Sequence, residues 1–129
     1  MPTWDEVTSF VRERYDVAVD ADETVGLVFK FEDGRTQYIG LTRFQAFDAE
    51  WFELKSTVCP SGEMSHTEAL RKNAAFALGA LALVGEDIVL VDNAPLATVD
   101  LGDLERSLHI LAATADQLEK EFASQSDAN

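Results

Sequence analysis

Residues that build most metal and nucleophilic sites are scarce in this sequence. Among 129 residues there are one cysteine and two histidines. The single cysteine, Cys59, cannot close an internal disulfide, which favours a reducing compartment. Structural zinc takes four Cys or His ligands, mostly at short spacing, and two distant histidines with one cysteine cannot supply them. We therefore predict no disulfide and no metal site.

Positive charge is the second shortage. Ten Lys and Arg residues stand against 24 Asp and Glu residues, so the formal net charge is -14. Such a surface repels phosphate backbones and anionic lipids. We therefore predict neither a nucleic-acid partner nor a membrane partner. The same acidity is common in proteins adapted to high salt, and the sequence leaves that origin open.

Long apolar runs are also missing. No segment reaches about 18 apolar residues, and residues 1–6 lack the basic and apolar regions of a signal peptide. These features predict a cytoplasmic protein. A chain of 129 residues that is 47% hydrophobic has the size and composition of one globular domain. We predict a single domain over residues 1–123, followed by a frayed polar tail over 124–129.

Two segments begin like ligand-binding loops, and each fails at a required position. Residues 20–22 resemble the start of a calcium loop, but the sixth and twelfth positions are not Gly and Glu. Residues 79–85 have the glycine spacing of a phosphate loop, but Glu86 and Asp87 replace the Lys and Ser/Thr that hold phosphate and magnesium. We therefore predict no cofactor.

Cys59 and His66 are the remaining candidates for a nucleophilic pair. They lie on either side of a Pro-Gly turn, so they could approach one another. Neither belongs to a recognisable catalytic signature, and the favoured interpretation is a strand-end thiol and a helix-start histidine. Carboxylate pairs are numerous in so acidic a chain and are typical of solvated surface. We therefore predict no catalytic residue.

Capping signals and helical spacing predict three helices. The sequences T-W-D-E from Thr3 and S-H-T-E from Ser65 are capping boxes, and they predict helices over 4–15 and 65–78. The last helix is expected to begin near Asp100. Its apolar residues alternate spacings of three and four, which predicts a narrow seam that packs along another helix or a sheet. The seam consists of Leu101, Leu104, Leu108, Leu111, Ala115, Leu118 and Phe122.

Alternation of apolar and polar residues predicts five strands. The clearest pair is 25–31 and 36–44, separated by Asp33-Gly34, a dipeptide suited to a tight hairpin. A third strand is predicted over 51–59, and a second hairpin joins 80–84 to 87–92. Residues 16–24 are polar and predict a loop. The fold class is then α+β in a single domain, of order αβββαββα, with helices packed on a largely antiparallel sheet.

A two-residue loop at Asp33-Gly34 fixes which residues share a face of the hairpin. It pairs Phe29 with Tyr38 and Val28 with Ile39. Leu27, Phe29, Phe31 and Tyr38 then lie on one face. The opposite face carries Val28, Ile39 and Leu41 among polar residues, so both faces of the hairpin are expected to be partly covered.

Large aromatic side chains gather around the connection that follows residue 43. Phe44, Phe47, Trp51 and Phe52 lie there, and two of them should point away from any single core. Two interpretations have equal weight: the loop folds back over the sheet, or it forms a binding surface. With the hairpin face, the second interpretation predicts a surface that binds a partner. Its residues are Val28, Ile39, Leu41, Phe44, Phe47 and Trp51.

The order of elements in an acidic chain of this length resembles the type III secretion chaperone-like fold, which the YbjN and Tir-chaperone families share. The resemblance lies in the opening helix over 4–15, the turn 33–37, the stretch 73–83 followed by 88–91, and the segment 94–119. It implies a non-enzymatic, usually homodimeric protein that holds an extended segment of a partner. No family contact residue can be transferred to this chain, because these families have no fixed ligand motif.

Three functional hypotheses follow from the sequence. The favoured one is a chaperone-like module that binds a protein or peptide client by strand addition or groove docking. The second is a regulatory or scaffolding subunit whose leucine seam or sheet edge makes a permanent interface. The third is an enzyme, because sites can be grafted onto any fold.

Overall fold

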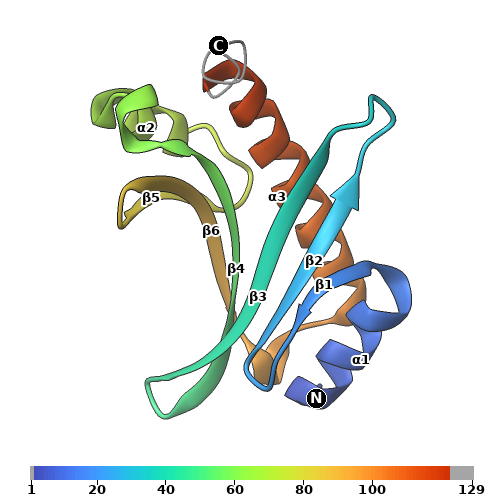
Figure 1. Ribbon diagram of the computed structural model, residues 1–129. Coiled ribbons are helices and arrows are strands. Elements are labelled where there is room, and N and C mark those ends of the chain that lie inside the picture. The colour runs from blue at the N-terminus through green and yellow to red at the C-terminus, as the bar shows by residue number, and fades with distance from the viewer. Residues whose placement is uncertain (1, 123–129) are drawn as a thin grey trace.

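The structure, a computed structural model, describes residues 2–122 and contains three α-helices and six β-strands over that range (Figure 1). In chain order they are α1 (Trp4–Arg14), β1 (Asp16–Asp20), β2 (Thr24–Lys30), β3 (Thr36–Ala46), β4 (Ala49–Pro60), α2 (His66–Asn73), β5 (Ala80–Val84), β6 (Asp87–Pro95) and α3 (Leu101–Phe122). The predicted α+β class and single domain are confirmed, and the predicted elements occur in the predicted order. The frayed tail predicted for 124–129 lies outside the described residues.

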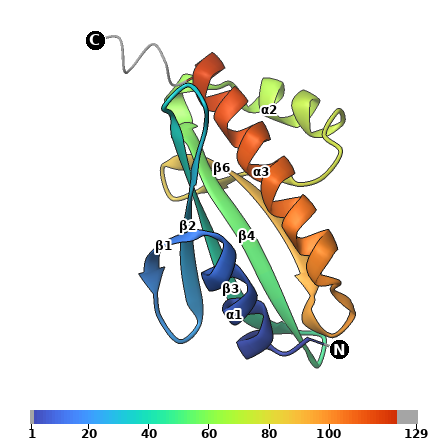
Figure 2. The same ribbon diagram turned by 90° about the vertical axis from the view of Figure 1, so that its right-hand side faces the viewer.

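All six strands form one antiparallel sheet in the order β1-β2-β3-β4-β6-β5. The helices lie on one side of this sheet, with α1 and α3 side by side over it and α2 near β5 (Figure 2). Their apolar residues share one core with the inward-facing residues of the strands. Within the described residues no helix covers the opposite side, which we call the open face.

The leucine seam of α3 packs against the sheet. Packing along a sheet was one of the two arrangements predicted for it, the other being packing along another helix. Leu104, Leu108 and Leu111 are fully buried in the core. The helix begins after Asp100, whose side-chain Oδ1 accepts hydrogen bonds from the backbone N–H groups of Gly102 at 2.8 Å and Asp103 at 3.1 Å. This cap satisfies two of the N–H groups that a helix start leaves without partners.

Both predicted capping boxes start helices. Thr3 Oγ1 accepts a hydrogen bond from the Glu6 N–H at 3.2 Å, and Ser65 Oγ accepts one from the Glu68 N–H at 3.1 Å. Helix α2 ends at Asn73, earlier than the predicted residue 78. The Asn73 carboxamide instead bonds to the backbone N–H and C=O of Leu81 at 2.7 and 3.3 Å, which ties the helix end to β5.

The hairpin β2–β3 forms where predicted, but its predicted register is wrong by one residue. The Phe31 N–H donates to the Arg35 carbonyl at 2.9 Å, so three residues make the turn, and Gly34 has a φ of 86°. This is the type I turn with a left-handed glycine that closes three-residue loops. Leu27 therefore pairs with Ile39.

This shift of one residue exchanges the two faces of β3. Side chains alternate along a strand, so a slip by one turns every side chain to the other face. Ile39 and Leu41 consequently face the helices and are fully buried. Tyr38, predicted to share a face with Phe29, lies instead opposite Val28 on the open face.

The loop predicted for residues 16–24 contains the edge strand β1. It pairs with β2 and has an irregular register between Val17 and Val19. Its aspartates bind basic residues of neighbouring elements: Asp20 takes a two-pronged contact from Arg12 of α1 at 2.7 and 3.0 Å, and Asp16 lies 3.2 Å from Lys30. A short strand with charged residues at both ends is typical of a sheet edge. The polar composition of residues 16–24 is the reason that the sequence predicted a loop there.

Candidate partner-binding surface

The β3–β4 hairpin ends in a strained turn with an aromatic residue at its apex. Ala46 pairs with Ala49, and the two residues between them, Phe47 and Asp48, have φ angles of 52° and 58°. Asn and Gly usually occupy such turns, because a side chain with a positive φ meets its own backbone. Phe47 is nevertheless 93% exposed. The turn therefore holds a large apolar side chain in water at a backbone position that disfavours it.

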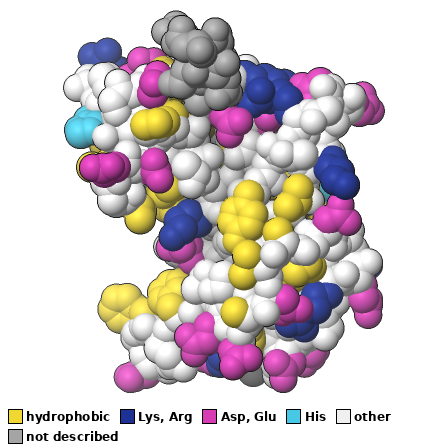
Figure 3. All heavy atoms as spheres, viewed as in Figure 1, with side chains coloured by type: hydrophobic (Ala, Val, Ile, Leu, Met, Phe, Trp, Pro, Cys, Tyr) yellow, Lys and Arg dark blue, Asp and Glu magenta, His cyan; other side chains and the backbone are white. Residues whose placement is uncertain are grey.

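Two more aromatic residues stand directly behind this apex. Phe44 and Trp51 are cross-strand partners, with ring centroids 6.3 Å apart and an interplanar angle of 22°. The Trp51 Nε1–H donates to the Ala46 carbonyl at 2.9 Å, which fixes the indole ring against the turn. We call Phe44, Phe47 and Trp51 the aromatic tip. It projects away from the helices, and hydrophobic side chains are visible at this end of the molecule (Figures 1 and 3).

The middle of the open face carries a second apolar area (Figure 3). Tyr38 and Val28 lie opposite one another on β3 and β2. The Tyr38 ring lies over Gly26, where an added Cβ would come within 2.2 Å of the Tyr38 hydroxyl oxygen. Any side chain at position 26 would lift the ring from the sheet. Gly26 thus lets an aromatic ring lie flat on the open face.

The structure therefore brings together four of the six residues predicted for the partner surface on one side of the sheet. Phe44, Phe47 and Trp51 form the aromatic tip, and Val28 lies on the same open face. The inclusion of Ile39 and Leu41 was wrong, because the three-residue turn places both in the core. Sequence reasoning missed Tyr38 for the same reason.

Cys59 and His66 do not form a reactive pair in the described geometry. Cys59 is buried in β4, and burial raises the pKa of its thiol, so the reactive thiolate is disfavoured. His66 is an exposed residue in the first turn of α2. No group of three or more His, Cys, Asp or Glu side chains in residues 2–122 is arranged to hold a metal ion. No helix in that range has the length and apolar character needed to cross a membrane.

A sheet with helices on one side, an open opposite face and an αββββαββα order is a form of the type III secretion chaperone-like fold. The resemblance predicted from the sequence is confirmed at the level of the fold. No protein-family model matches the chain, and no curated protein matches its sequence.

Two solved structures carry this conclusion. One is described as the structure of the HopA1-SchA chaperone-effector complex; the match has a TM-score of 0.62 at 14% identity and covers 88% of this chain and 90% of that one. The other is the crystal structure of the ExsC-ExsE complex, with a TM-score of 0.51 at 16% identity and 79% of each chain covered. At these identities the likeness concerns the fold.

Proposed function

We propose that this protein is a non-enzymatic, chaperone-like binding protein that holds an extended segment of a protein partner on its open face. The observation that carries the proposal is the exposure of Phe47 on a strained turn. Strained backbone and exposed aromatic residues both favour a binding role, since neither stabilises the free protein. The chaperone-effector complex among the similar structures supports the same class of function.

The geometry suits an extended segment. Side chains of such a segment project alternately, so every second one would meet the sheet. Tyr38 and Val28 offer an apolar contact in the middle of the open face, and the aromatic tip offers another at its end. Aromatic residues held rigidly are the usual anchors of an interface. The net charge of -14 keeps such a surface soluble between binding events.

Replacing Phe47 with asparagine tests this function. We expect the variant to lose at least about tenfold in affinity for peptides that the unmodified protein captures from an array of varied apolar spacing and charge. Its free energy of unfolding should stay the same or rise by up to about 1 kcal/mol, because asparagine tolerates a positive φ. Val19→Asn is the matched control: Val19 is also exposed, but on edge strand β1. Unchanged capture by the Phe47 variant would contradict the proposal.

We also propose that the protein is cytoplasmic, and that it forms a homodimer, as the resemblance implies. Light scattering after gel filtration should give a mass near twice 14.2 kDa. The measurement needs molar salt as well as low salt, because repulsion between two acidic chains is screened only at high ionic strength. A monomer in both conditions would contradict the homodimer.

A regulatory or scaffolding subunit is the second candidate function. An apolar pocket of about 190 Å³ lies between α2 and β5, lined by Leu70, Leu81 and Leu83 among others. Strand β5 is an edge of the sheet, and Leu70 and Leu83 are exposed. An apolar groove beside the free edge of a sheet is typical of an interface with a folded partner.

A further inference from the structure

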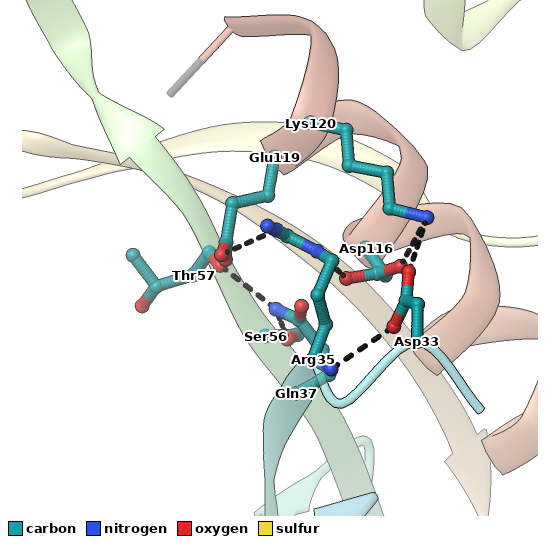
Figure 4. A network of polar contacts seen from close by, with 8 residues as sticks. All are labelled: Asp33, Arg35, Gln37, Ser56, Thr57, Asp116, Glu119 and Lys120. Carbon is teal, nitrogen blue, oxygen red and sulfur yellow. Dashed lines mark hydrogen bonds and ion pairs between the residues drawn. The ribbon is translucent and has the colours of Figure 1, made fainter. Parts of the chain in front are cut away.

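Strands β3 and β4 separate at one end of the sheet. They pair from Ala46↔Ala49 to Gly40↔Lys55, and beyond that point β4 continues only against β6. Side chains bridge the separated strands instead. The Ser56 hydroxyl donates to the Tyr38 carbonyl at 2.7 Å. The Gln37 Nε2 donates to the Thr57 carbonyl at 3.2 Å (Figure 4).

A cavity of about 410 Å³ lies at this separation. The residues that line it include Gln37 and Tyr38 of β3, and Thr57 and Pro60 of β4. It reaches Asp87 at the start of β6 and Glu119 of α3. Because Tyr38 belongs to the open face, the cavity lies within reach of a segment bound there.

One buried hydrogen-bond acceptor in this wall has no partner. Gln37 is only 4% exposed, and its Nε2 group donates to both Ser56 Oγ and the Thr57 carbonyl. Among the described residues its Oε1 atom is the one buried side-chain nitrogen or oxygen without a hydrogen bond. Rotating the Gln37 amide so that its oxygen and nitrogen change places gives the oxygen no donor either. The Thr57 carbonyl can only accept, and the Ser56 hydroxyl proton is already donated to the Tyr38 carbonyl. The wall of the cavity therefore contains a buried acceptor that lacks a donor, and a donor entering the cavity reaches it only after neighbouring side chains shift.

The negative charge of the cavity favours a hydrogen-bond donor that is positively charged. Asp87 and Glu119 are carboxylates, and no Lys or Arg is among the described residues that line the cavity. Arg35 contacts Glu119 at 2.9 Å and balances that charge, which leaves Asp87 to attract a cation. Val58 and Pro60 also line the cavity and give an aliphatic stem apolar residues to contact. A guanidinium group has five N–H donors, enough for an amide oxygen and a carboxylate together.

We propose that this cavity receives an arginine side chain of the partner segment, with the guanidinium group donating to Gln37 Oε1 and pairing with Asp87. The inference rests on the proposed function for the presence of that segment. The recognition itself belongs to the cavity alone, so a single blocked amino acid can probe it.

The test is a titration of isotope-labelled protein with N-acetyl-arginine amide, followed by nuclear magnetic resonance. We expect the Gln37 side-chain amide and the backbone amides of Thr57 and Val58 to shift. N-acetyl-citrulline amide, which has the same shape without the charge, should bind at least about tenfold more weakly. Equal binding of the two compounds, or no shift at Gln37, would overturn the proposal.

Variants separate this inference from the function on which it rests. Asp87→Asn and Gln37→Met should each weaken binding of the arginine compound severalfold, and Asp87→Asn does so without touching the bridge between the strands. Asp103→Asn, which removes an exposed carboxylate on α3, is the matched control and should bind normally. Phe47→Asn should also bind the compound normally, so loss of peptide capture alone would count against the proposed function and not against the cavity. Unchanged binding in Asp87→Asn would refute the inference.

Discussion

Replacing Ile39 with aspartate is expected to unfold the protein at 25 °C. Ile39 is fully buried in the middle of β3, opposite Leu27. The change removes a core side chain, a loss of about 2–5 kcal/mol, and places a carboxyl group without a partner in the core. A domain of this size has only about 5–15 kcal/mol of stability in total. Circular dichroism should therefore show loss of structure, and urea should produce no cooperative transition.

Two companion variants show that position, and not the new charge, decides the outcome. Val28→Asp introduces the same group on the partner strand β2, at a half-buried site of the open face, and should cost only about 1–2 kcal/mol. Phe47→Asp should keep native circular dichroism, because Phe47 lies outside the core. A native spectrum and cooperative unfolding for Ile39→Asp would mean that the three-residue turn is wrong and that Ile39 lies at the surface.

The sequence predicts the β2–β3 hairpin but does not determine which residues of its two strands pair. Asp33-Gly34 marks a hairpin correctly, but it fits either a two-residue turn or a three-residue turn that ends in a left-handed glycine. Hydrophobic alternation did not decide between them, because apolar side chains occupy both faces of β3. In the three-residue-turn register Ile39 and Leu41 share a face with Leu27, and in the two-residue-turn register Tyr38 does. The Asp33 carboxylate bonds to the Arg35 N–H at 2.9 Å and helps to close the longer turn.

The aromatic tip was predictable because its residues are neighbours in the sequence. Phe44 and Trp51 pair across a hairpin formed by two consecutive strands. Large aromatic residues on both sides of the connection therefore indicate an aromatic cluster from the sequence. Two interpretations of this connection had equal weight, and the 93% exposure of Phe47 rules out a loop folded back over the sheet. The positive φ of Phe47 had no signal in the sequence, since neither Asn nor Gly occupies the turn.

The cavity beside Gln37 could not be predicted, because it depends on the places where strands stop pairing. It combines residues of β3, β4, β6 and α3, which are remote in the chain. Its origin is the separation of β3 from β4 near an irregularity in β4, between Thr57 and Cys59. Such irregularities bend a strand and end its pairing on one side. Residue types and spacing carry no trace of this geometry.

A network of charged residues stabilises the same end of the molecule (Figure 4). Arg35 follows the β2–β3 turn, and its Nε lies 2.8 Å from Asp116 Oδ1, while its Nη2 lies 2.9 Å from Glu119. The Asp116 side chain is only 6% exposed. Its other contact is Lys120, at 3.4 Å. The hairpin is therefore tied to the last third of α3 by the Arg35 guanidinium on a buried carboxylate and by Asp33, which lies 3.0 Å from Lys120.

Replacing Arg35 with methionine should consequently lower the free energy of unfolding by about 2–3 kcal/mol. The figure lies below that for a fully enclosed pair, because Arg35 is partly exposed and Lys120 still contacts Asp116. Urea denaturation measures the loss. Arg106→Met removes an arginine that pairs with Asp103 on the exposed side of α3, and it should change stability by less than about 0.5 kcal/mol.

The double variant Arg35→Met with Asp116→Leu shows why the single change is destabilising. If the loss arises from a buried carboxylate left without its cation, a leucine at 116 should restore most of the lost stability. If it arises instead from lost packing of the arginine stem, the second change should bring no recovery. Equal destabilisation by Arg35→Met and Arg106→Met would show that Asp116 does not depend on Arg35. The ion pairs of Arg35 would then contribute little to holding the hairpin on α3.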